Sequence, residues 1–434
     1  FGADLRFLNG RIGVDVAYYK INTRNQILKL DAVKESGVTK QLINAGNIQN
    51  QGWELQLDFR PIQTRTVRWE IGLNWSRNRS KIKEFYEGIS SYKLFDNGTG
   101  GIPGIYAFEN GAFGQIVSGS GYGYTSDGAG VAAVFRNMDD PNDPRNGKML
   151  INYGGTTSSL NLPYYSIVRG SQVTNYYHGV LGKDEDGNQI DGYNTPGDKP
   201  YLYDVLGKVE PDFFAGLTTS LTVNLPNNSG SFDFFAQIDG RVGGHMISSK
   251  LREAMQYGNV EMALYGRDEE HGGVARVNYK GETVYNGMIP DGVFYKDFKV
   301  TRKDNGQEVT VKAGTTFAEA VEAGDIEPML SAIWYTQGGN YGFWGAQNIN
   351  VSKATYFSLR EVTLGYNFPD KWIKHVGLQS ARLSFSGRNL CYIYNGMRGG
   401  INPESISSNN PLTPVDYGGV PYARNFSINL NLRF

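Results

Sequence analysis

The sequence contains a single cysteine, Cys391, so no disulfide can form within its 434 residues. Cysteine usage therefore leaves the redox compartment undecided, and we expect Cys391 to be a small filler on a strand. No apolar run approaches the roughly 18 to 20 residues that a membrane-spanning helix requires. A helical span is excluded, but a membrane location is not, because the strands of a transmembrane barrel need only alternate residues to be apolar.

Net charge and catalytic motifs are also missing. The 42 Lys plus Arg against 43 Asp plus Glu leave a net charge of -1, which gives no electrostatic reason to expect nucleic acid. The sequence has no H-E-x-x-H, C-x-x-C or Walker A motif. Four histidines are scattered without ligand spacing: His178, His245, His271 and His375. We therefore predict that the protein is not an enzyme and holds no cofactor or metal on these residues.

Strand-forming and turn-forming residues are abundant. Aromatic residues make up 13% of the chain, and 56 glycines lie among many Asn, Asp, Thr and Ser, a mixture that favours strands joined by turns. From Asn425 to Phe434 polar and apolar residues alternate without error, which indicates a two-faced strand. Similar alternation recurs at 12–19, 53–60, 67–76, 217–225, 231–239, 362–368 and 382–388. Phe357 and Leu359 are out of phase with Val362, which predicts a bulge near Arg360 or Glu361.

The lengths of strands and connections point to a membrane barrel. The runs reach about 9 to 13 residues, enough for a tilted strand to cross a bilayer. Short connections (Asn9-Gly10, Pro61 to Arg65, Pro226 to Gly230, Pro369 to Gly377) alternate with long ones (Asp31 to Ala45, Lys81 to Pro211, Gly244 to Ala354, Asn395 to Pro421). Transmembrane barrels have short periplasmic turns and long outer loops. Counting back from Phe434 at the periplasmic end, every short connection falls on the periplasmic side.

Further features concern the strand ends and the long loops. Six aromatic residues near strand ends on the apolar face should lie at the lipid headgroup level: Trp69, Trp75, Tyr366, Phe368, Trp372 and Phe434. Short helices are predicted at Thr316 to Ala323, which has a polar cap and a glycine stop, and at Ser248 to Tyr257. The segment Ile105 to Tyr124 is a candidate further spanning strand. We thus expect nine clear strands and up to two more.

Several segments resemble SusC/RagA-type TonB-dependent transporters. Asn44 to Leu57, N-A-G-N-I-Q-N-Q-G-W-E-L-Q-L, is similar to the family's "NAGxxxNxGxE" strand opening. Val205 to Gly216, V-L-G-K-V-E-P-D-F-F-A-G, looks like its "GxxxPDF..G" strand start. Tyr356 to Pro369, Arg382 to Leu390 and the terminal Phe434 match as well. These motifs span nearly the whole chain in the family's order.

The resemblance implies an all-β fold, a transmembrane antiparallel β-barrel of about 22 strands with long extracellular loops. Residues 1–434 would be the C-terminal portion of that barrel, because the signal peptide, the TonB-contacting box and the plug domain are absent from this sequence. Half a barrel would leave two strand edges unpaired in lipid. We therefore expect the remaining N-terminal barrel strands and the plug to come from another polypeptide or a nicked piece.

The resemblance also implies energised nutrient uptake in the outer membrane of a Gram-negative, Bacteroidetes-type cell. A SusD-like surface lipoprotein would cap the mouth, and the TonB-ExbB-ExbD complex would act through the missing plug. Polar rows would line the aqueous path. Glycans or oligosaccharides are the expected cargo, and oligopeptides are the alternative. A surface β-rich ligand-binding protein without a pore is the other class, and solubility without detergent would distinguish it.

Two groups of loop residues are candidate binding sites. An aromatic cluster beside amides suits the stacking and hydrogen bonding of sugar rings or extended peptides: Trp334, Tyr335, Tyr341, Phe343 and Trp344. The alternative is that these rings pack the loop against its neighbours. Asp184, Asp186 and Asp191 offer carboxylates to Ca²⁺, but the bidentate Glu of a calcium loop is lacking. A surface turn around Asp186-Gly187 is the favoured interpretation of that segment.

Overall fold

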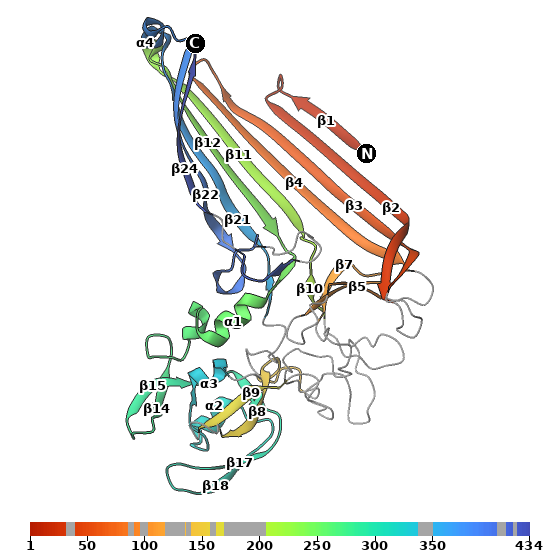
Figure 1. The fold of residues 1–434 in the computed structure, drawn as a ribbon, viewed down its shortest axis with the longest axis vertical. Helices are drawn as coiled ribbons and strands as arrows, with labels where there is room; N and C mark the ends of the chain where they lie inside the picture. Colours follow the sequence, from red (N-terminus) through yellow and green to blue (C-terminus); the bar gives the residue numbers. More distant parts are fainter. Residues whose placement is uncertain are drawn as a thin grey trace.

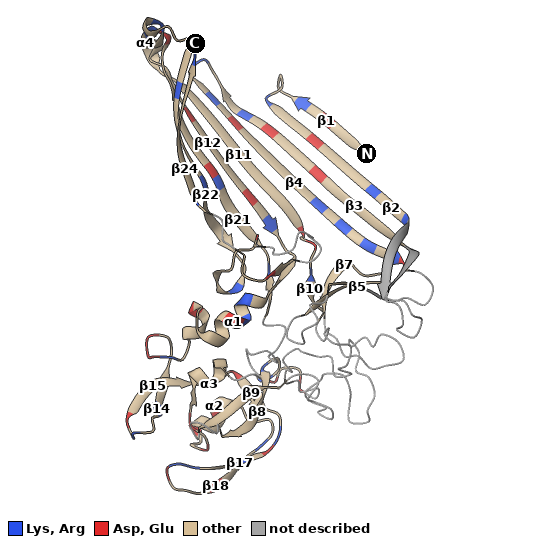
Figure 2. Cartoon of the chain, viewed as in Figure 1, with Lys and Arg blue, Asp and Glu red and all other residues tan. Residues whose placement is uncertain are grey.

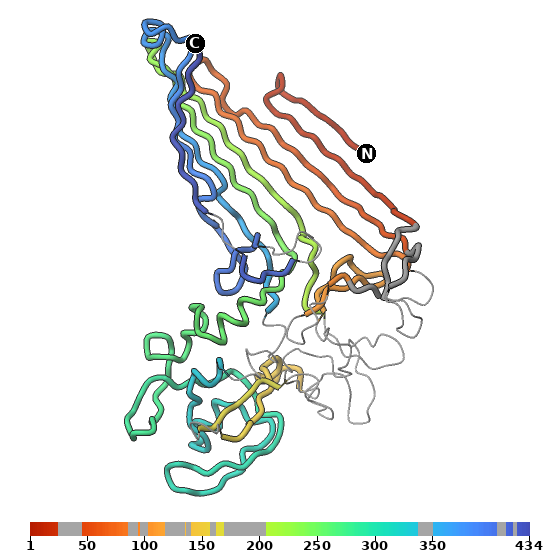
Figure 3. The backbone as a smooth tube through the Cα atoms, viewed as in Figure 1, coloured from red at the N-terminus to blue at the C-terminus, as the bar shows by residue number. Residues whose placement is uncertain are grey.

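The computed structural model describes residues 1–31, 40–85, 91–95, 103–117, 135, 140–156, 162–168, 205–336, 350–405, 414–419 and 423–434. Its main feature is a nine-stranded antiparallel sheet in the order β1-β2-β3-β4-β11-β12-β21-β22-β24. The strands are β1 Gly2–Phe7, β2 Ile12–Asp31, β3 Lys40–Gln63, β4 Val67–Glu84, β11 Phe213–Asn224, β12 Ser231–Val242, β21 Tyr356–Asn367, β22 Ser380–Asn395 and β24 Asn425–Arg433. The nine clear strands predicted from the sequence are confirmed: the eight alternating segments lie in eight of these strands, and β1 precedes the Asn9-Gly10 turn. Figure 3 shows β1 and β24 at the two edges.

Tight connections join neighbouring strands at one end of the sheet, and the long loops leave from the other end (Figure 1). The turn between β1 and β2 contains Asn9 and Gly10 with φ of 56° and 79°, values that the Asn-Gly pair adopts easily. The turn after β11 includes the 3-10 helix η3, Pro226–Asn228. The helix α4, Asp370–Ile373, and the 3-10 helix η6, Lys374–Val376, lie between β21 and β22.

Two sequence predictions about connections are wrong. Asp31 to Ala45 is not a loop throughout, because β2 continues to Asp31 and β3 begins at Lys40. Ile105 to Tyr124 is not one spanning strand, because it contains two short strands, β6 Gly104–Phe108 and β7 Phe113–Val117. Asn110, with φ of 59°, lies in the turn between them.

Smaller sheets occupy the long loops. A four-stranded sheet has the order β10-β7-β6-β5, and three-stranded sheets are β20-β13-β23, β14-β15-β19 and β16-β8-β9. β17 and β18 form a hairpin. The bounds are β5 Ser91–Phe95, β8 Met149–Thr156, β9 Pro163–Ile167, β10 Val205–Lys208, β13 His245–Ser248, β14 Val274–Val277, β15 Thr283–Met288, β16 Gly292–Phe294, β17 Phe298–Thr301, β18 Glu308–Val311, β19 Met329–Leu330, β20 Val351–Lys353 and β23 Val415–Asp416.

Both predicted loop helices are confirmed. The helix α1, Ser249–Tyr257, begins after Ser248, whose side chain accepts a hydrogen bond from the Leu251 backbone N–H. The helix α2, Phe317–Glu322, begins with a capping box between Thr316 and Glu319. Hydrogen bonds from Thr316 hold the pKa of the Glu319 carboxyl below its usual value. The remaining helical elements are α3 Ser331–Thr336, η4 Glu261–Leu264 and η7 Arg398–Gly400.

Within the described ranges, the largest apolar core lies in the loop region and not within the large sheet. Phe294, Phe317 and Trp334 are each 1% exposed or less and belong to one cluster contributed by α1, α2, α3, β9 and β16. The loops after β12 therefore pack together with β8 and β9 of the loop after β4. Among the described residues, no helix has both the length and the apolar character needed to span a membrane.

Candidate functional site

The large sheet has one apolar face that is open. Alternate residues of neighbouring strands align in rows, one of which runs Trp69, Leu221, Phe234, Leu364, Phe385 and Ile428. Leu364 is 57% exposed and Ile428 is 76% exposed, so no second layer of the described protein covers these residues. Such a face in water would be an extended exposed apolar patch, which monomeric soluble proteins rarely show.

The opposite face is polar, and its side chains are bonded to one another across strands. Thr363 Oγ1 lies 2.8 Å from Ser386 Oγ of β22, and within β21 it donates to Glu361 Oε1 at 2.9 Å. Farther along, Arg382 Nε and Asn367 Nδ2 both donate to Asp233 Oδ2, at 3.2 and 2.6 Å. These cross-strand bonds hold the polar row in place.

The predicted bulge is confirmed at Arg360. Glu361 pairs with Gln237 and Leu359 pairs with Ile238, so Arg360 has no opposite partner on β12. The register with the neighbouring strand β22 is interrupted at the same place, between the pairs that Leu359 and Glu361 form with β22. A bulge turns two consecutive side chains toward one face. Arg360 and Glu361 therefore both point to the polar face, although strict alternation would place Arg360 on the apolar face.

Arg360 is the centre of an ionic network on the polar face. Its guanidinium pairs with Asp239 of β12 and with Glu404 of the loop after β22. Tyr356 Oη donates to Glu404 Oε1 at 3.1 Å, and Tyr392 Oη donates to Glu404 Oε2 at 2.7 Å. The Glu404 carboxylate is thus held by one cation and two phenols. This network fixes the loop after β22 against the sheet.

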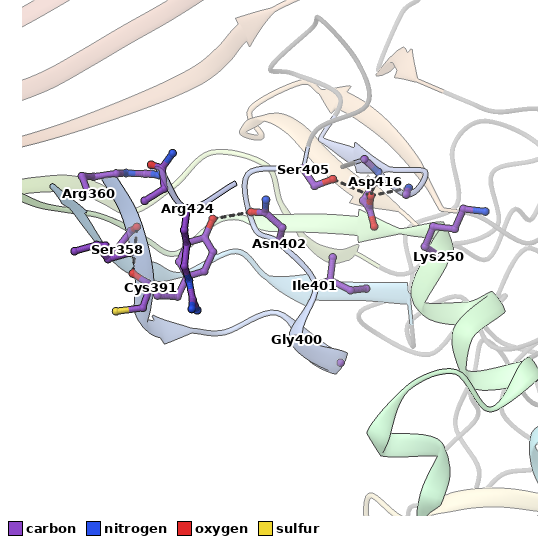
Figure 4. Close-up of a pocket in the computed structure, with 16 residues that line it drawn as sticks. Lys250, Ser358, Arg360, Cys391, Gly400, Ile401, Asn402, Ser405, Asp416 and Arg424 are labelled. Carbon is purple, nitrogen blue, oxygen red and sulfur yellow. Dashed lines mark hydrogen bonds between the residues drawn. The ribbon is translucent and has the colours of Figure 1, made fainter. Parts of the chain in front are cut away.

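A pocket of about 490 Å³ lies beside this network (Figure 4). Its wall away from the sheet is organised by Asp416, which is 2% exposed. Asp416 accepts hydrogen bonds from Ser248 Oγ at 3.0 Å, Ser405 Oγ at 3.2 Å and the Gly418 backbone N–H at 2.8 Å. Buried carboxylates are stable when their oxygens are bonded in this way. Lys250, Arg424, Cys391 and Asn402 also line the pocket.

The pocket has the features of a ligand-binding site. Its lining includes the cations Lys250 and Arg424 together with the phenol of Tyr392 and the amide of Asn402, which lie 2.6 Å apart (Tyr392 Oη to Asn402 Oδ1). Lys250 is paired with Glu253 at 2.6 Å, so Arg424 is the more available cation. Among the described residues, no group of three or more His, Cys, Asp or Glu is placed to hold a metal ion. The pocket is therefore a candidate site for a ligand that has both polar and apolar groups.

Replacing Arg360 with methionine should destabilise this junction by about 2 kcal/mol, because Asp239 and Glu404 would face each other without a cation. The value is below the range for a fully buried pair, since the Arg360 side chain is 18% exposed. Denaturant unfolding of the full-length protein in detergent, with limited trypsin digestion at Arg398, would measure it. The control is Arg388→Met, whose side chain is 64% exposed in its pair with Glu361 and should contribute under about 1 kcal/mol.

The residues predicted from the sequence as ligand-binding lie elsewhere. Trp334 and Tyr335 are on α3 and are 1% and 2% exposed within the loop core. Tyr335 Oη donates to the Tyr265 carbonyl at 3.1 Å. These two rings therefore take the packing role that was the alternative. Three aromatic residues (Tyr341, Phe343, Trp344) and the calcium candidates (Asp184, Asp186, Asp191) lie outside the described residues, so their roles stay predictions.

The ionic network around Arg360 was not predicted from the sequence. The phase shift between Leu359 and Val362 located the bulge but not its partners. Glu404 lies 44 residues from Arg360, in a loop where no periodic pattern exists. Only the fold brings the two side chains together.

Comparison with known proteins agrees with the resemblance noted in the sequence. No protein-family model matches the chain. TonB-dependent receptor P3 of Formosa agariphila is 22% identical over 442 residues, covering 100% of this chain and 33% of the receptor. TonB-dependent receptor P39 of the same organism is 23% identical over 440 residues, covering 100% of this chain and 35% of the receptor. The chain therefore spans about a third of the length of the curated relatives it matches.

Solved structures show the same fold. The RagAB peptide importer in the "closed-closed" state matches with a TM-score of 0.54 at 16% identity, over 99% of this chain and 34% of that chain. Its "open-open" state matches with a TM-score of 0.54 at 15% identity, over 100% of this chain and 34% of that chain. The predicted likeness to TonB-dependent transporters and the all-β barrel-type fold are confirmed.

Proposed function

We propose that this chain forms part of the wall of a TonB-dependent importer in a bacterial outer membrane. The observation that carries the proposal is the open apolar face of the nine-stranded sheet, which is opposed by a bonded polar face. In a membrane barrel the apolar face meets lipid and the polar face lines an aqueous interior. The chain contributes the wall and part of the ligand surface, and we assign it no catalytic step.

The two edges of the sheet bear on the rest of the barrel. Within the described residues, β1 and β24 each pair with one neighbour only. An unpaired edge in lipid costs several kcal/mol for each unsatisfied backbone group. We propose that strands outside these 434 residues close a barrel of about 22 strands and that a plug domain fills it. The tight turns would face the periplasm, and the long loops would face outward.

For the cargo we propose a glycan or oligosaccharide held under a SusD-like surface lipoprotein, with TonB-ExbB-ExbD supplying energy. The phenol, amide and charged groups around the pocket would bond to a hydroxyl-rich chain. An oligopeptide is the second candidate, because the RagAB structures that share this fold are those of a peptide importer.

Measuring uptake by cells with and without the full-length protein would test both the importer function and the proposed cargo. We expect uptake of labelled oligosaccharides to fall at least tenfold without the protein, and also when a protonophore removes the energy source. A comparable loss for labelled oligopeptides alone would transfer the assignment to peptide cargo. Unchanged uptake of both classes, or a full-length protein that stays in solution without detergent, would refute the importer.

A further inference from the structure

The apolar face of the sheet changes character toward the loop end of β2, β3 and β4. There the register aligns three successive rows, which are Tyr18-Trp53-Arg77, Lys20-Gln51-Arg79 and Asn22-Gln49-Lys81. Each row lies two residues beyond the last, about 7 Å farther along the strands. The row before them, Val16-Leu55-Trp75, is still apolar. The face therefore passes from apolar to aromatic to basic within a short distance.

Basic side chains dominate this end of the face. Figure 2 shows Lys and Arg close together along β4, at the end that leads to the loops. Lys20, Arg77 and Lys81 are exposed, and in the described part of the chain they have no ion pair. Arg79 differs, because it donates to Asp212 Oδ1 at 2.9 Å, a carboxylate shared with Lys208. Asp212 and Glu210, which also lines the surface, thus offset only part of the positive charge.

Arg77, Arg79 and Lys81 also line a concave surface, whereas Lys20 lies outside its two hollows. One hollow of about 420 Å³ is lined by Tyr18, Trp53, Arg77 and neighbouring groups. A second of about 460 Å³ is lined by Lys81, Lys83, Lys208 and others. Both hollows include Gln51 and Arg79, so they adjoin. A ligand here would meet several cations and two amide side chains, Gln49 and Gln51.

We propose that this surface binds a phosphate-bearing lipid of the leaflet on the long-loop side of the membrane. The inference rests on the proposed function, since it requires the apolar face to lie in lipid. Tyr18 and Trp53 mark the headgroup level, where amphipathic rings are favoured. Acyl chains would lie over the row of Leu55 and Trp75. The phosphate would lie between Arg77 and Lys81, where cations form strong bonds to phosphate oxygens.

Hydration alone is the simpler explanation of these basic side chains, because Lys and Arg side chains near a membrane interface extend to water. It does not account for the collection of cations in adjoining hollows directly beyond an aromatic row. A phosphate with acyl chains matches both the charge and the apolar surface beside it. We therefore name a phospholipid-type headgroup and not a free anion.

The test uses full-length protein purified in detergent, with monophosphoryl lipid A as the probe and native mass spectrometry to count bound lipid. We expect the triple variant Lys20→Gln, Arg77→Gln, Lys81→Gln to lose at least tenfold in affinity. The variant Lys20→Arg, Lys81→Arg should retain wild-type binding. A matched control removes the same charge at the opposite end of the sheet, by Arg11→Gln, Arg60→Gln and Arg68→Gln, and should also bind as wild type.

The outcomes separate the two proposals. Equal binding by the triple variant and wild type, or equal binding of the dephosphorylated lipid, would overturn the lipid site while leaving the importer intact. If millimolar inorganic phosphate displaced the bound lipid as effectively as free lipid does, the surface would be a plain anion site. That result would also overturn the lipid site. A full-length protein that needs no detergent would instead remove the importer on which the inference rests.

Discussion

Replacing Trp334 with alanine is expected to lower the free energy of unfolding of the loop unit by about 3–5 kcal/mol, the cost of removing a large buried aromatic ring. The Trp334 ring is 1% exposed and lies in the same cluster as Phe294 and Phe317. The cavity left by the indole would not close fully, because close-packed interiors relax only in part. The effect should be local to the loop core, which the segment after β12 shares with β8 and β9.

Hydrogen exchange over 249–336 in the full-length protein would measure this loss. Trp334→Phe should cost less than the alanine variant, since a smaller volume is removed. Trp372→Ala serves as the control, because Trp372 is 54% exposed on α4 at the other end of the sheet and should leave exchange in 249–336 unchanged. If Trp334→Ala lowered cargo affinity with no change in exchange, Trp334 would be a ligand contact after all.

This experiment bears on the aromatic cluster that the sequence offered as a binding site. Aromatic rings beside amide side chains occur both in sugar-binding sites and in the cores of loops. The order of residues in the sequence does not distinguish these two cases. Burial of Trp334 and Tyr335 in the loop core supports the packing role for these two rings. The ligand role of Tyr341, Phe343 and Trp344 stays a prediction. The strongest candidate for a ligand-binding site is now the pocket beside Arg360.

The sheet was predictable because one physical constraint acts on every second residue. Wherever the two faces meet different surroundings, the sequence must alternate, as it does from Asn425 to Phe434. The constraint ends where both faces are polar. Asn22 and Gln49 are paired, and so are Ile21 and Asn50, yet neither face of this part of the ribbon keeps an apolar row. Period-2 patterning is thus lost before the predicted loop at Asp31 to Ala45 begins. The strand residues Lys40 to Ala45 within that loop carry no alternation either, so the start of β3 was missed.

The contacts that make up the pocket could not be predicted in the same way. Asp416 is bonded to Ser248, which lies 168 residues away, through a pairing of two short parallel strands. Strands of two to four residues carry no periodic signal. The segment Ile105 to Tyr124 failed for a related reason, since a turn at Asn110 divides it into two strands that are shorter than the window in which alternation is recognisable.

Replacing Ile428 with arginine should destabilise the barrel by about 2–4 kcal/mol, the cost of a cation facing the hydrocarbon near the middle of a bilayer. Ile428 lies beside Phe385 in the apolar row and is 76% exposed. An exposed side chain in a protein surrounded by water would accept the same change with a cost within about 0.5 kcal/mol. The substitution therefore reports directly on what surrounds this face.

Asn429→Arg is the matched control, because Asn429 is the next residue on β24 and points to the polar face, opposite Ser384. In a barrel with an aqueous interior this arginine remains hydrated, so we expect wild-type stability. Unfolding free energies in lipid bilayers and the amount of folded protein in the outer-membrane fraction would measure both variants. Equal behaviour of the pair would mean that the two faces of β24 have the same surroundings, which no transmembrane barrel permits, whereas a loss confined to Ile428→Arg requires lipid on one side only.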